Sequence, residues 1–167
     1  MMARSHVVVG VAAWLAAAPL LHLAPYDPAY LVLAAAGALL PDVDHPASWV
    51  GRRTRPLSTA LAALLGHRGV THSALAVLGL LALLAEAGGR RGVVAALVVG
   101  YLSHLAADML TPRGLRLAWP LRGSWGVPLC RTGSAMETVI VLALVAGTLW
   151  SMRHEAALAA LCGRVCR

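Results

Sequence analysis

Long apolar runs separated by short polar stretches make up most of this 167-residue chain. The runs are rich in Ala, Leu and Val and show no alternation of polar and apolar positions, so they predict helices rather than strands. Several approach the roughly 20 residues that a helix needs to cross the hydrocarbon core of a bilayer. Because lipid offers no hydrogen-bond partner to an open backbone, such runs cross a membrane as helices. The pattern therefore predicts an all-α, polytopic transmembrane helical bundle.

About five membrane helices and one shorter helix follow from the positions of these runs. The membrane helices are expected at residues 5–21, 28–40, 72–86, 92–110 and 133–152. Pro41 and Pro112 follow the second and fourth runs, as expected where a helix stops. The run at residues 56–65 is too short to span and is expected to be an interfacial or re-entrant helix. We expect one membrane-embedded domain, residues 1–152, and a C-terminal tail, residues 153–167.

Composition and charge support a membrane protein. Hydrophobic residues make up 59% of the chain and charged residues 13%, which is about half the charged share of soluble proteins. All fourteen basic residues are Arg and lie between the apolar runs, a placement typical of topology signals and headgroup contacts. We therefore expect membrane lipids, and no nucleic acid, as partners. Nine Arg fall on the side of the N-terminus and five on the other, which predicts a cytoplasmic N-terminus.

Nine histidines and carboxylates occur where odd-numbered membrane helices begin or even-numbered ones end. Consecutive membrane helices alternate in direction, so all nine are expected at one membrane face. They are His6, Asp42, Asp44, His45, His67, His72, His104, Asp108 and Glu137. A mixed set of this kind suits Zn²⁺ first, or Mn²⁺, Fe²⁺ or Ni²⁺, whereas Mg²⁺ and Ca²⁺ prefer oxygen ligands. The sequence therefore predicts a divalent metal ion at this face.

Local spacing adds to this hypothesis. His104 and Asp108 are four residues apart and share one stripe of a helix; the alternative is a hydrogen-bonded pair that joins two helices. Residues 42–45 (DVDH) lie between two prolines, and the alternative there is a polar turn that caps a neighbouring helix. Thr71, next to His72, is expected to be the N-cap of the third membrane helix.

Roles can be assigned to these residues by their chemistry. The candidate metal ligands are His6, Asp42, His45, His67, His72, His104 and Asp108. One tetrahedral site needs fewer ligands than these seven, so either two metals bind or some of these residues surround the metal without binding it. Asp44 and Glu137 are candidates to carry a proton from a metal-activated water. Arg68 is a candidate to bind a phosphate or carboxylate group, or to anchor the protein to headgroups.

Three motifs occur in a fixed order along the chain. They are residues 39–46 (LLPDVDHP), 66–73 (GHRGVTHS) and 100–112 (GYLSHLAADMLTP), followed by Trp119 and Pro120. At these motifs the chain resembles the YdjM-like family of bacterial inner-membrane metal-dependent hydrolases, from about Ser5 to Trp150. The resemblance implies a bacterial inner-membrane location and a hydrolase with a divalent metal. The resemblance does not indicate a substrate.

We therefore expect a membrane-bound hydrolase that uses a divalent metal to activate water at the cytoplasmic membrane face, on a small, lipid-like or phosphorylated substrate. One alternative is a divalent cation or proton transporter that uses the same His/Asp cluster, but the far ends of the runs are apolar, with only His22 and Asp27 in the first outer loop. A haem protein with His72 and His104 as axial ligands is less consistent with the many carboxylates. A non-catalytic membrane adaptor is the fourth candidate. The sequence does not indicate an oligomeric state.

Overall fold

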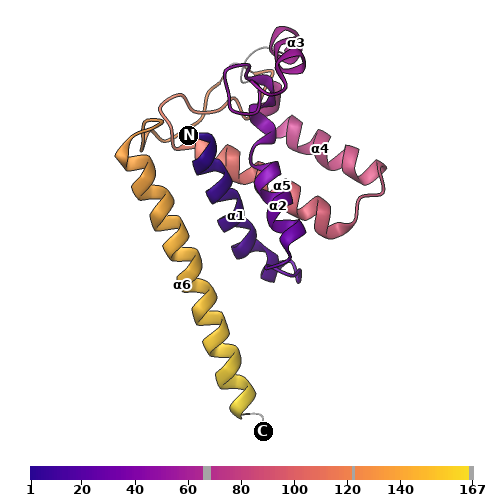
Figure 1. The fold of residues 1–167 in the computed structure, drawn as a ribbon. Helices are drawn as coiled ribbons and strands as arrows, with labels where there is room; N and C mark the ends of the chain where they lie inside the picture. The colour runs from indigo at the N-terminus through magenta and orange to yellow at the C-terminus, as the bar shows by residue number, and fades with distance from the viewer. Residues whose placement is uncertain (66–68, 122, 166–167) are drawn as a thin grey trace.

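The computed structural model describes residues 1–65, 69–121 and 123–165, and the secondary structure of this part of the chain is helical (Figure 1). The α-helices are α1 (Ala3–Leu20), α2 (Pro28–Gly37), α3 (Arg55–Leu65), α4 (Ala74–Glu86), α5 (Arg91–Met109) and α6 (Ala135–Val165). Two short 3₁₀ helices, η1 (Leu40–Asp44) and η2 (Val70–His72), follow α2 and precede α4. Each of the five predicted membrane segments contains an α-helix, so the predicted all-α membrane bundle is confirmed.

The helices differ in their capacity to span a membrane. Three are long and apolar enough to do so: α1, α5 and the part of α6 from Ala135 to His154. The 10 residues of α2 and the 13 residues of α4 correspond to about 15 and 20 Å of helix. Both are shorter than the roughly 30 Å hydrocarbon core. They instead pack beside the spanning helices, α2 against α5 and α1, and α4 against α5.

Glycines allow α2 to lie very close to α5. A Cβ atom at Gly100 of α5 would stand 2.0 Å from the carbonyl oxygen of Ala34, and one at Gly37 of α2 would stand 2.2 Å from that of Leu97. Small residues at the crossing points of membrane helices permit this kind of backbone approach. The close packing fixes the end of α2 against the turn of α5 that follows Gly100 and carries His104.

An apolar cluster fills the bundle between these helices. Trp14, Ala18, Ala34 and Ala96 are completely buried and pack together. The indole nitrogen of Trp14 donates a hydrogen bond to the carbonyl oxygen of Pro25, at 3.2 Å, so the polar atom of this large side chain is satisfied. The cluster joins α1, α2 and α5 away from the polar end of the molecule.

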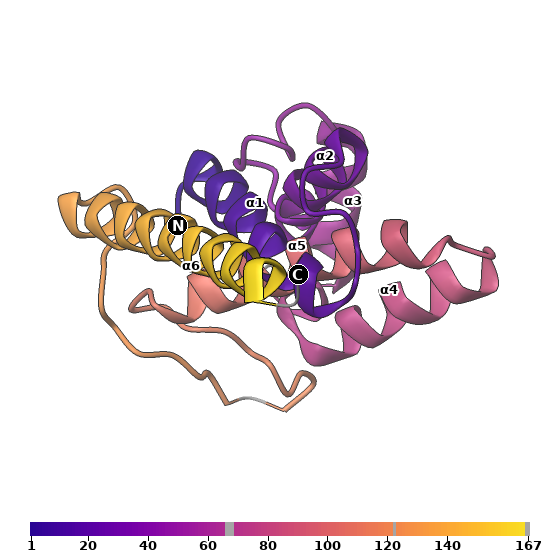
Figure 2. The ribbon, with the colours of Figure 1, turned by 90° about the horizontal axis from the view of Figure 1, so that it is seen from below.

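The remaining segments match two sequence predictions in part. The short helix predicted at residues 56–65 is present as α3, at the same end of the molecule as the N-terminus (Figure 1), while its place in the membrane interface stays a prediction. The backbone of α6 continues as one helix across residue 152 to Val165. The division into a membrane domain and a tail at that residue also stays a prediction. In Figure 2, which turns the molecule by 90°, α6 again runs along α1.

Candidate metal centre

The polar residues predicted at one face are brought to one end of the bundle. The start of α1, the end of α2 with η1, the start of α4 with η2, the end of α5 and the start of α6 all lie there (Figure 1). Of the eight predicted residues that the structure describes, six are at most 2% exposed: His6, Asp44, His72, His104, Asp108 and Glu137. Ionisable groups at membrane depth are costly unless they pair or bind a metal. Their burial together marks this end as the candidate functional site.

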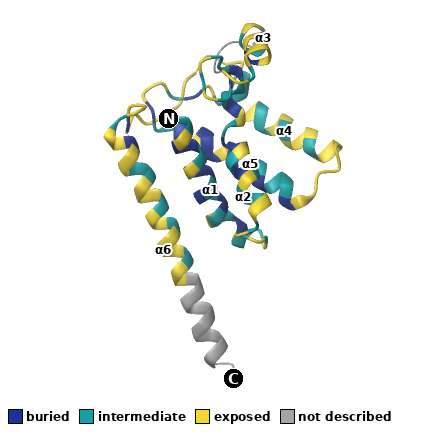
Figure 3. Cartoon of the chain, viewed as in Figure 1, coloured by how far each residue is buried: buried dark blue, intermediate teal, exposed yellow. Residues whose placement is uncertain are grey.

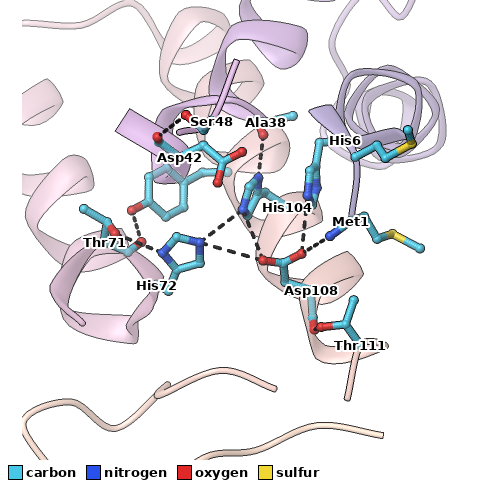
Figure 4. Close-up of polar contacts among 12 residues, drawn as sticks. Met1, His6, Ala38, Asp42, Ser48, Thr71, His72, His104, Asp108 and Thr111 are labelled. Atoms are coloured by element: carbon cyan, nitrogen blue, oxygen red, sulfur yellow. Dashed lines mark hydrogen bonds and ion pairs between the residues drawn. The ribbon is translucent and has the colours of Figure 1, made fainter. Parts of the chain in front are cut away.

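Three ligand-type atoms form a small triangle at its centre (Figure 4). The Nε2 atoms of His72 and His104 are 3.3 Å apart. The Oδ2 atom of Asp108 lies 3.8 Å from the first and 3.7 Å from the second. Bonds of about 2.0–2.1 Å around a tetrahedral Zn²⁺ place neighbouring ligand atoms about 3.3 Å apart. The triangle is therefore close to the size of one face of a metal coordination shell.

The second ring nitrogen of His104 identifies its tautomer. Its Nδ1 lies 2.7 Å from the carbonyl oxygen of Ala38 at the end of α2. A carbonyl oxygen can only accept, so Nδ1 carries the proton. The Nε2 atom of His104 consequently directs a lone pair toward His72 and Asp108.

A hydrogen-bonded chain gives the same result for His72. The Nδ1 atom of His72 is 2.9 Å from the hydroxyl oxygen of Thr71, which is 2.5 Å from Oδ2 of Asp44. The carboxylate accepts the single hydroxyl proton of Thr71, so His72 Nδ1 must donate to that hydroxyl. In the neutral form of His72, the Nε2 atom then carries the lone pair.

The two Nε2 atoms and one carboxylate oxygen thus converge, at 3.3–3.8 Å from one another. A divalent cation placed between these atoms would accept a lone pair from each of them. Metal-binding histidines characteristically donate their other N–H to a carbonyl or carboxylate partner, as His104 does to Ala38 and as His72 does through Thr71. The residues present therefore fit a divalent metal ion.

Two further predicted ligands flank this triangle. His6 stacks on His104, with ring centroids 3.8 Å apart, and its Nε2 is 3.3 Å from Oδ1 of Asp108. Its Nδ1 is buried and has no hydrogen-bond partner in the described part of the chain. Asp42 lies on another side and can bring a carboxylate oxygen within 4.8 Å of ligand atoms of both His72 and His104. His6, His104 and Asp108 form one possible ligand group, and Asp42, His72 and His104 form another. The two groups share His104 and so describe one connected centre.

Other predicted residues lie outside these groups. His45 is half-buried, and its Nδ1 accepts a hydrogen bond from the backbone N–H of Ala47 at 3.1 Å. Asp44 supports His72 through Thr71 rather than facing the triangle, and its Oδ1 is buried without a hydrogen-bond partner in the described residues. His67 and Arg68 lie outside the residues that the structure describes.

Glu137 joins the start of α6 to the start of α1. Its Oε1 accepts from the backbone N–H of Met2 at 2.8 Å and from the Ser5 hydroxyl. Its Oε2 accepts from the backbone N–H of Gly133 at 2.7 Å. This carboxylate therefore fastens two helix ends beside the candidate centre, and its predicted role in proton transfer stays a prediction.

A cavity of about 560 Å³ opens beside the centre. Its lining includes Asp42, His45, Trp49, Arg113 and Arg131. Asp42 belongs both to this lining and to a candidate ligand group. Asp42 therefore links the cavity to the candidate ligand group.

The structure adds one residue and corrects one prediction. The hydroxyl of Tyr101 donates a hydrogen bond to the carbonyl oxygen of Thr71; Tyr101 is three residues before His104, so helical spacing could have identified it. Thr71 is not the N-cap of α4, as the sequence predicted. Ser73 is the cap, because its hydroxyl accepts from the backbone N–H of Ala76 at 3.3 Å. The Thr71 hydroxyl instead forms hydrogen bonds with Asp44 and with the candidate ligand His72.

Comparisons with known proteins place these motifs in a family. The family model described as "YdjM inner membrane protein" matches residues 1–166. The chain is 42% identical over 124 residues to the inner membrane protein YdjM of Escherichia coli (strain K12) and to that of Shigella flexneri, covering 70% of this chain and 63% of each relative. It is 32% identical over 146 residues to the uncharacterized protein YvsG of Bacillus subtilis (strain 168), covering 86% of this chain and 89% of that protein. No solved structure matches.

Proposed function

The chain belongs to the YdjM family of inner membrane proteins, and from this premise we propose that it is a membrane-bound hydrolase that uses a divalent metal to activate water. The proposed ligands are His72, His104 and Asp108, with His6 and Asp42 on their flanks. Zn²⁺ is the first choice for this donor set, with Mn²⁺, Fe²⁺ and Ni²⁺ as alternatives. The proposal places the centre at the cytoplasmic face. The chain spans 63% of the length of two of its relatives. That it shares an activity with those whole proteins is therefore part of the proposal.

One observation carries this proposal: the assigned tautomers of the two buried histidines. Each Nδ1 proton is held by a fixed acceptor, Ala38 for His104 and Thr71 for His72. Each Nε2 lone pair is therefore directed at the other histidine and at Asp108. The Oδ1 atom of Asp108 is paired with the Met1 ammonium group and with His6, whereas its Oδ2 atom faces the two Nε2 atoms, as a ligand of a shared metal would.

The chain's own residues have definite places in such a reaction. A bound divalent metal supplies a water of lowered pKa and polarises a phosphoryl or acyl oxygen. Asp42 faces both the cavity and the histidines, so its carboxylate is placed to accept the proton that the attacking water loses. Asp44, through Thr71, keeps the Nδ1 proton on His72. The predicted contact of Arg68 with the substrate remains part of the proposal, as does the predicted proton transfer by Asp44 or Glu137.

The packing of the bundle favours a hydrolase over a transporter. A transported cation needs a polar route to the other side of the membrane. The buried apolar cluster of Trp14, Ala18, Ala34 and Ala96 occupies the space between α1, α2 and α5 beyond the centre. A centre with an apolar cluster on the side opposite its membrane face suits a reaction at that one face.

Elemental analysis of purified protein tests the proposal most directly. We expect about one equivalent or more of a transition metal in the unaltered protein and loss of that metal in His104→Ala. His22→Ala is the matched control, because His22 is an exposed histidine at the far end of α1. Metal-dependent release of p-nitrophenol from phosphate and acyl esters should disappear in His104→Ala alone. Protein that is folded by circular dichroism but holds no stoichiometric metal would overturn the proposal, as would a metal-loaded protein that hydrolyses neither ester class.

A further inference from the structure

The cavity beside the centre has two basic side chains in its lining. Arg113 and Arg131 are both exposed, and neither has an ion-pair or side-chain hydrogen-bond partner in the described part of the chain. Arg guanidinium groups recognise phosphate through paired hydrogen bonds and charge. Two such groups at one cavity match the charge of about −1.5 to −2 on a phosphate monoester at neutral pH.

An apolar groove adjoins this cavity. Ala3 and Trp49 line both the cavity and a groove of about 410 Å³ along the first turns of α1. The groove is also lined by Val7, Val8 and Leu39, with Arg4 at its polar end. A molecule with its charged group in the cavity can therefore continue past Trp49 onto an apolar surface.

A second groove extends this surface along α1 and α6. It has a volume of about 260 Å³, shares Val7 and Val8 with the first groove, and reaches Leu15 on α1 and Leu149 on α6. The two helices that form it are both long and apolar enough to span a membrane, and they lie side by side in Figures 1 and 2. Its surroundings are therefore lipid.

The length of the combined grooves matches one leaflet. From Ala3 to Leu15 the axis of α1 advances about 18 Å, at about 1.5 Å per residue. Half of the hydrocarbon core is about 15 Å thick. The apolar surface is thus long enough for one acyl chain that starts at the membrane face and ends near the bilayer centre.

We propose that the cavity and the two grooves together bind a membrane lipid that carries a phosphate monoester, with the phosphate at Arg113 and Arg131 and one acyl chain along α1. The phosphate then lies beside Asp42, which faces the metal centre. This assignment names the substrate class of the proposed hydrolase and so rests on the proposed function. Binding of the lipid, however, needs no hydrolysis and can be measured separately.

Native mass spectrometry of the full chain in detergent tests the headgroup site, with dioleoyl phosphatidic acid and dioleoyl phosphatidylcholine as probes. We expect the protein to retain phosphatidic acid, and the Arg113→Gln/Arg131→Gln double variant to retain at least about tenfold less. Arg116→Gln is the matched control, since Arg116 is an exposed arginine of the same loop outside the cavity. Equal loss in Arg116→Gln, or no loss in the double variant, would overturn the proposed site.

A second pair of variants tests the acyl-chain groove. Val8→Trp fills the surface shared by both grooves, whereas Ala16→Trp adds the same side chain at an exposed position of α1 outside them. We expect Val8→Trp alone to weaken retention of phosphatidic acid. Inorganic phosphate at millimolar concentration should leave the lipid bound. If inorganic phosphate displaces it fully and Val8→Trp has no effect, the site is one for a soluble phosphate and the lipid proposal is wrong.

The same measurements separate this inference from the proposed function. They are repeated on His104→Ala, which is expected to lack metal and hydrolysis. Lipid retained by His104→Ala, with the same dependence on Arg113 and Arg131, supports the binding site even if the unaltered protein proves inactive. Conversely, metal-dependent ester hydrolysis by a protein that retains no phosphatidic acid would support the hydrolase and overturn the lipid site.

Discussion

The membrane-spanning segments of α5 (Arg91–Met109) and α6 (Ala135–His154) are alike in length and apolar composition but differ in how they are packed. Both can span a membrane, yet 50% of the spanning window of α5 is buried within the protein, against 11% for α6. In Figure 3, α6 is mostly exposed along its described length, whereas α5 lies inside the bundle. Apolar composition therefore reveals which segments enter the membrane, but it does not reveal which of them build the protein's interior.

Small and polar residues account for the difference. Buried positions of α5 recur every four residues at Gly92, Ala96, Gly100 and His104, and Asp108 extends the same stripe. These residues let neighbouring helices approach closely and carry the candidate ligands. Among residues 135–154 of α6, only Glu137 is buried. Helix α5 is therefore the scaffold of the centre, while α6 is joined to α1 by Glu137, packs on the bundle with Ile140 and Val141, and leaves most of its remaining described surface exposed.

We expect the largest difference between the two helices when the same Gly→Ala substitution is made in each of them. Gly100→Ala on α5 forces a Cβ to within 2.0 Å of the Ala34 carbonyl oxygen, whereas a Cβ at Gly147 on α6 meets nothing within 4 Å. We expect Gly100→Ala to cost about 3 kcal/mol or to prevent folding, since overpacking forces the backbones apart. Gly147→Ala should be neutral or stabilising, because Ala favours helices over Gly by up to about 1 kcal/mol.

Thermal unfolding in one detergent, followed by circular dichroism, measures both variants. Gly100→Ala should also lower metal content, because the displaced end of α2 carries the Ala38 carbonyl that holds His104. Equal stability of the two variants would show that the close approach of α2 to α5 is not what holds the bundle together.

The clustering of the candidate ligands could be predicted from the sequence more readily than the groups that support them. The four-residue spacing of His104 and Asp108 and the alternation of helices placed the buried side chains at one end, and the structure brings them together. The partner of His104 is the backbone carbonyl of Ala38, and no sequence pattern marks an individual carbonyl. Thr71 was predicted to cap α4, because the preference of Thr for helix starts does not distinguish a cap from a hydroxyl that bonds side chains.

The ends of the helices, like the supports of the centre, could be predicted from the sequence only in part. The apolar runs at 28–40 and 72–86 predicted membrane helices, but α2 ends at Gly37 and α4 starts at Ala74. The 3₁₀ segments η1 and η2, which contain Asp42, Asp44 and His72, lie next to these shortened ends. Tertiary hydrogen bonds, such as that from Tyr101 to Thr71, compete with helix propagation there. Such long-range contacts cannot be read from local apolar patterns.

A pair of threonine variants tests whether the supports of the centre matter as the geometry implies. Thr71→Val removes the hydroxyl between His72 and Asp44. Thr148→Val on α6 removes a hydroxyl that donates only to the Leu144 carbonyl of its own helix. Loss of an outer-shell partner typically weakens metal binding about 10- to 100-fold, so we expect that loss in Thr71→Val and none in Thr148→Val.

Competition with a chelator of known affinity gives the metal dissociation constants of both threonine variants. Asp44→Asn should weaken binding as well, because the amide holds the Thr71 hydroxyl less strongly than the carboxylate does. Unchanged metal affinity in Thr71→Val would show that the tautomer of His72 is not set by this chain of hydrogen bonds.

The smallest expected effect concerns Glu137, the buried carboxylate in the first turn of α6. In Glu137→Gln the side chain keeps an oxygen for Met2 and Ser5, but its amide group faces the backbone N–H of Gly133. One charge-assisted hydrogen bond is lost, and we expect a cost of about 1 kcal/mol. Because the carboxylate joins α6 to α1 rather than supporting the ligands, metal content should stay unchanged while hydrogen exchange of residues 133–140 becomes faster. Glu86→Gln, at the exposed end of α4, is the control and should alter neither. If Glu137→Gln instead abolishes hydrolysis with its stability intact, Glu137 takes part in the reaction and α6, like α5, contributes to the centre.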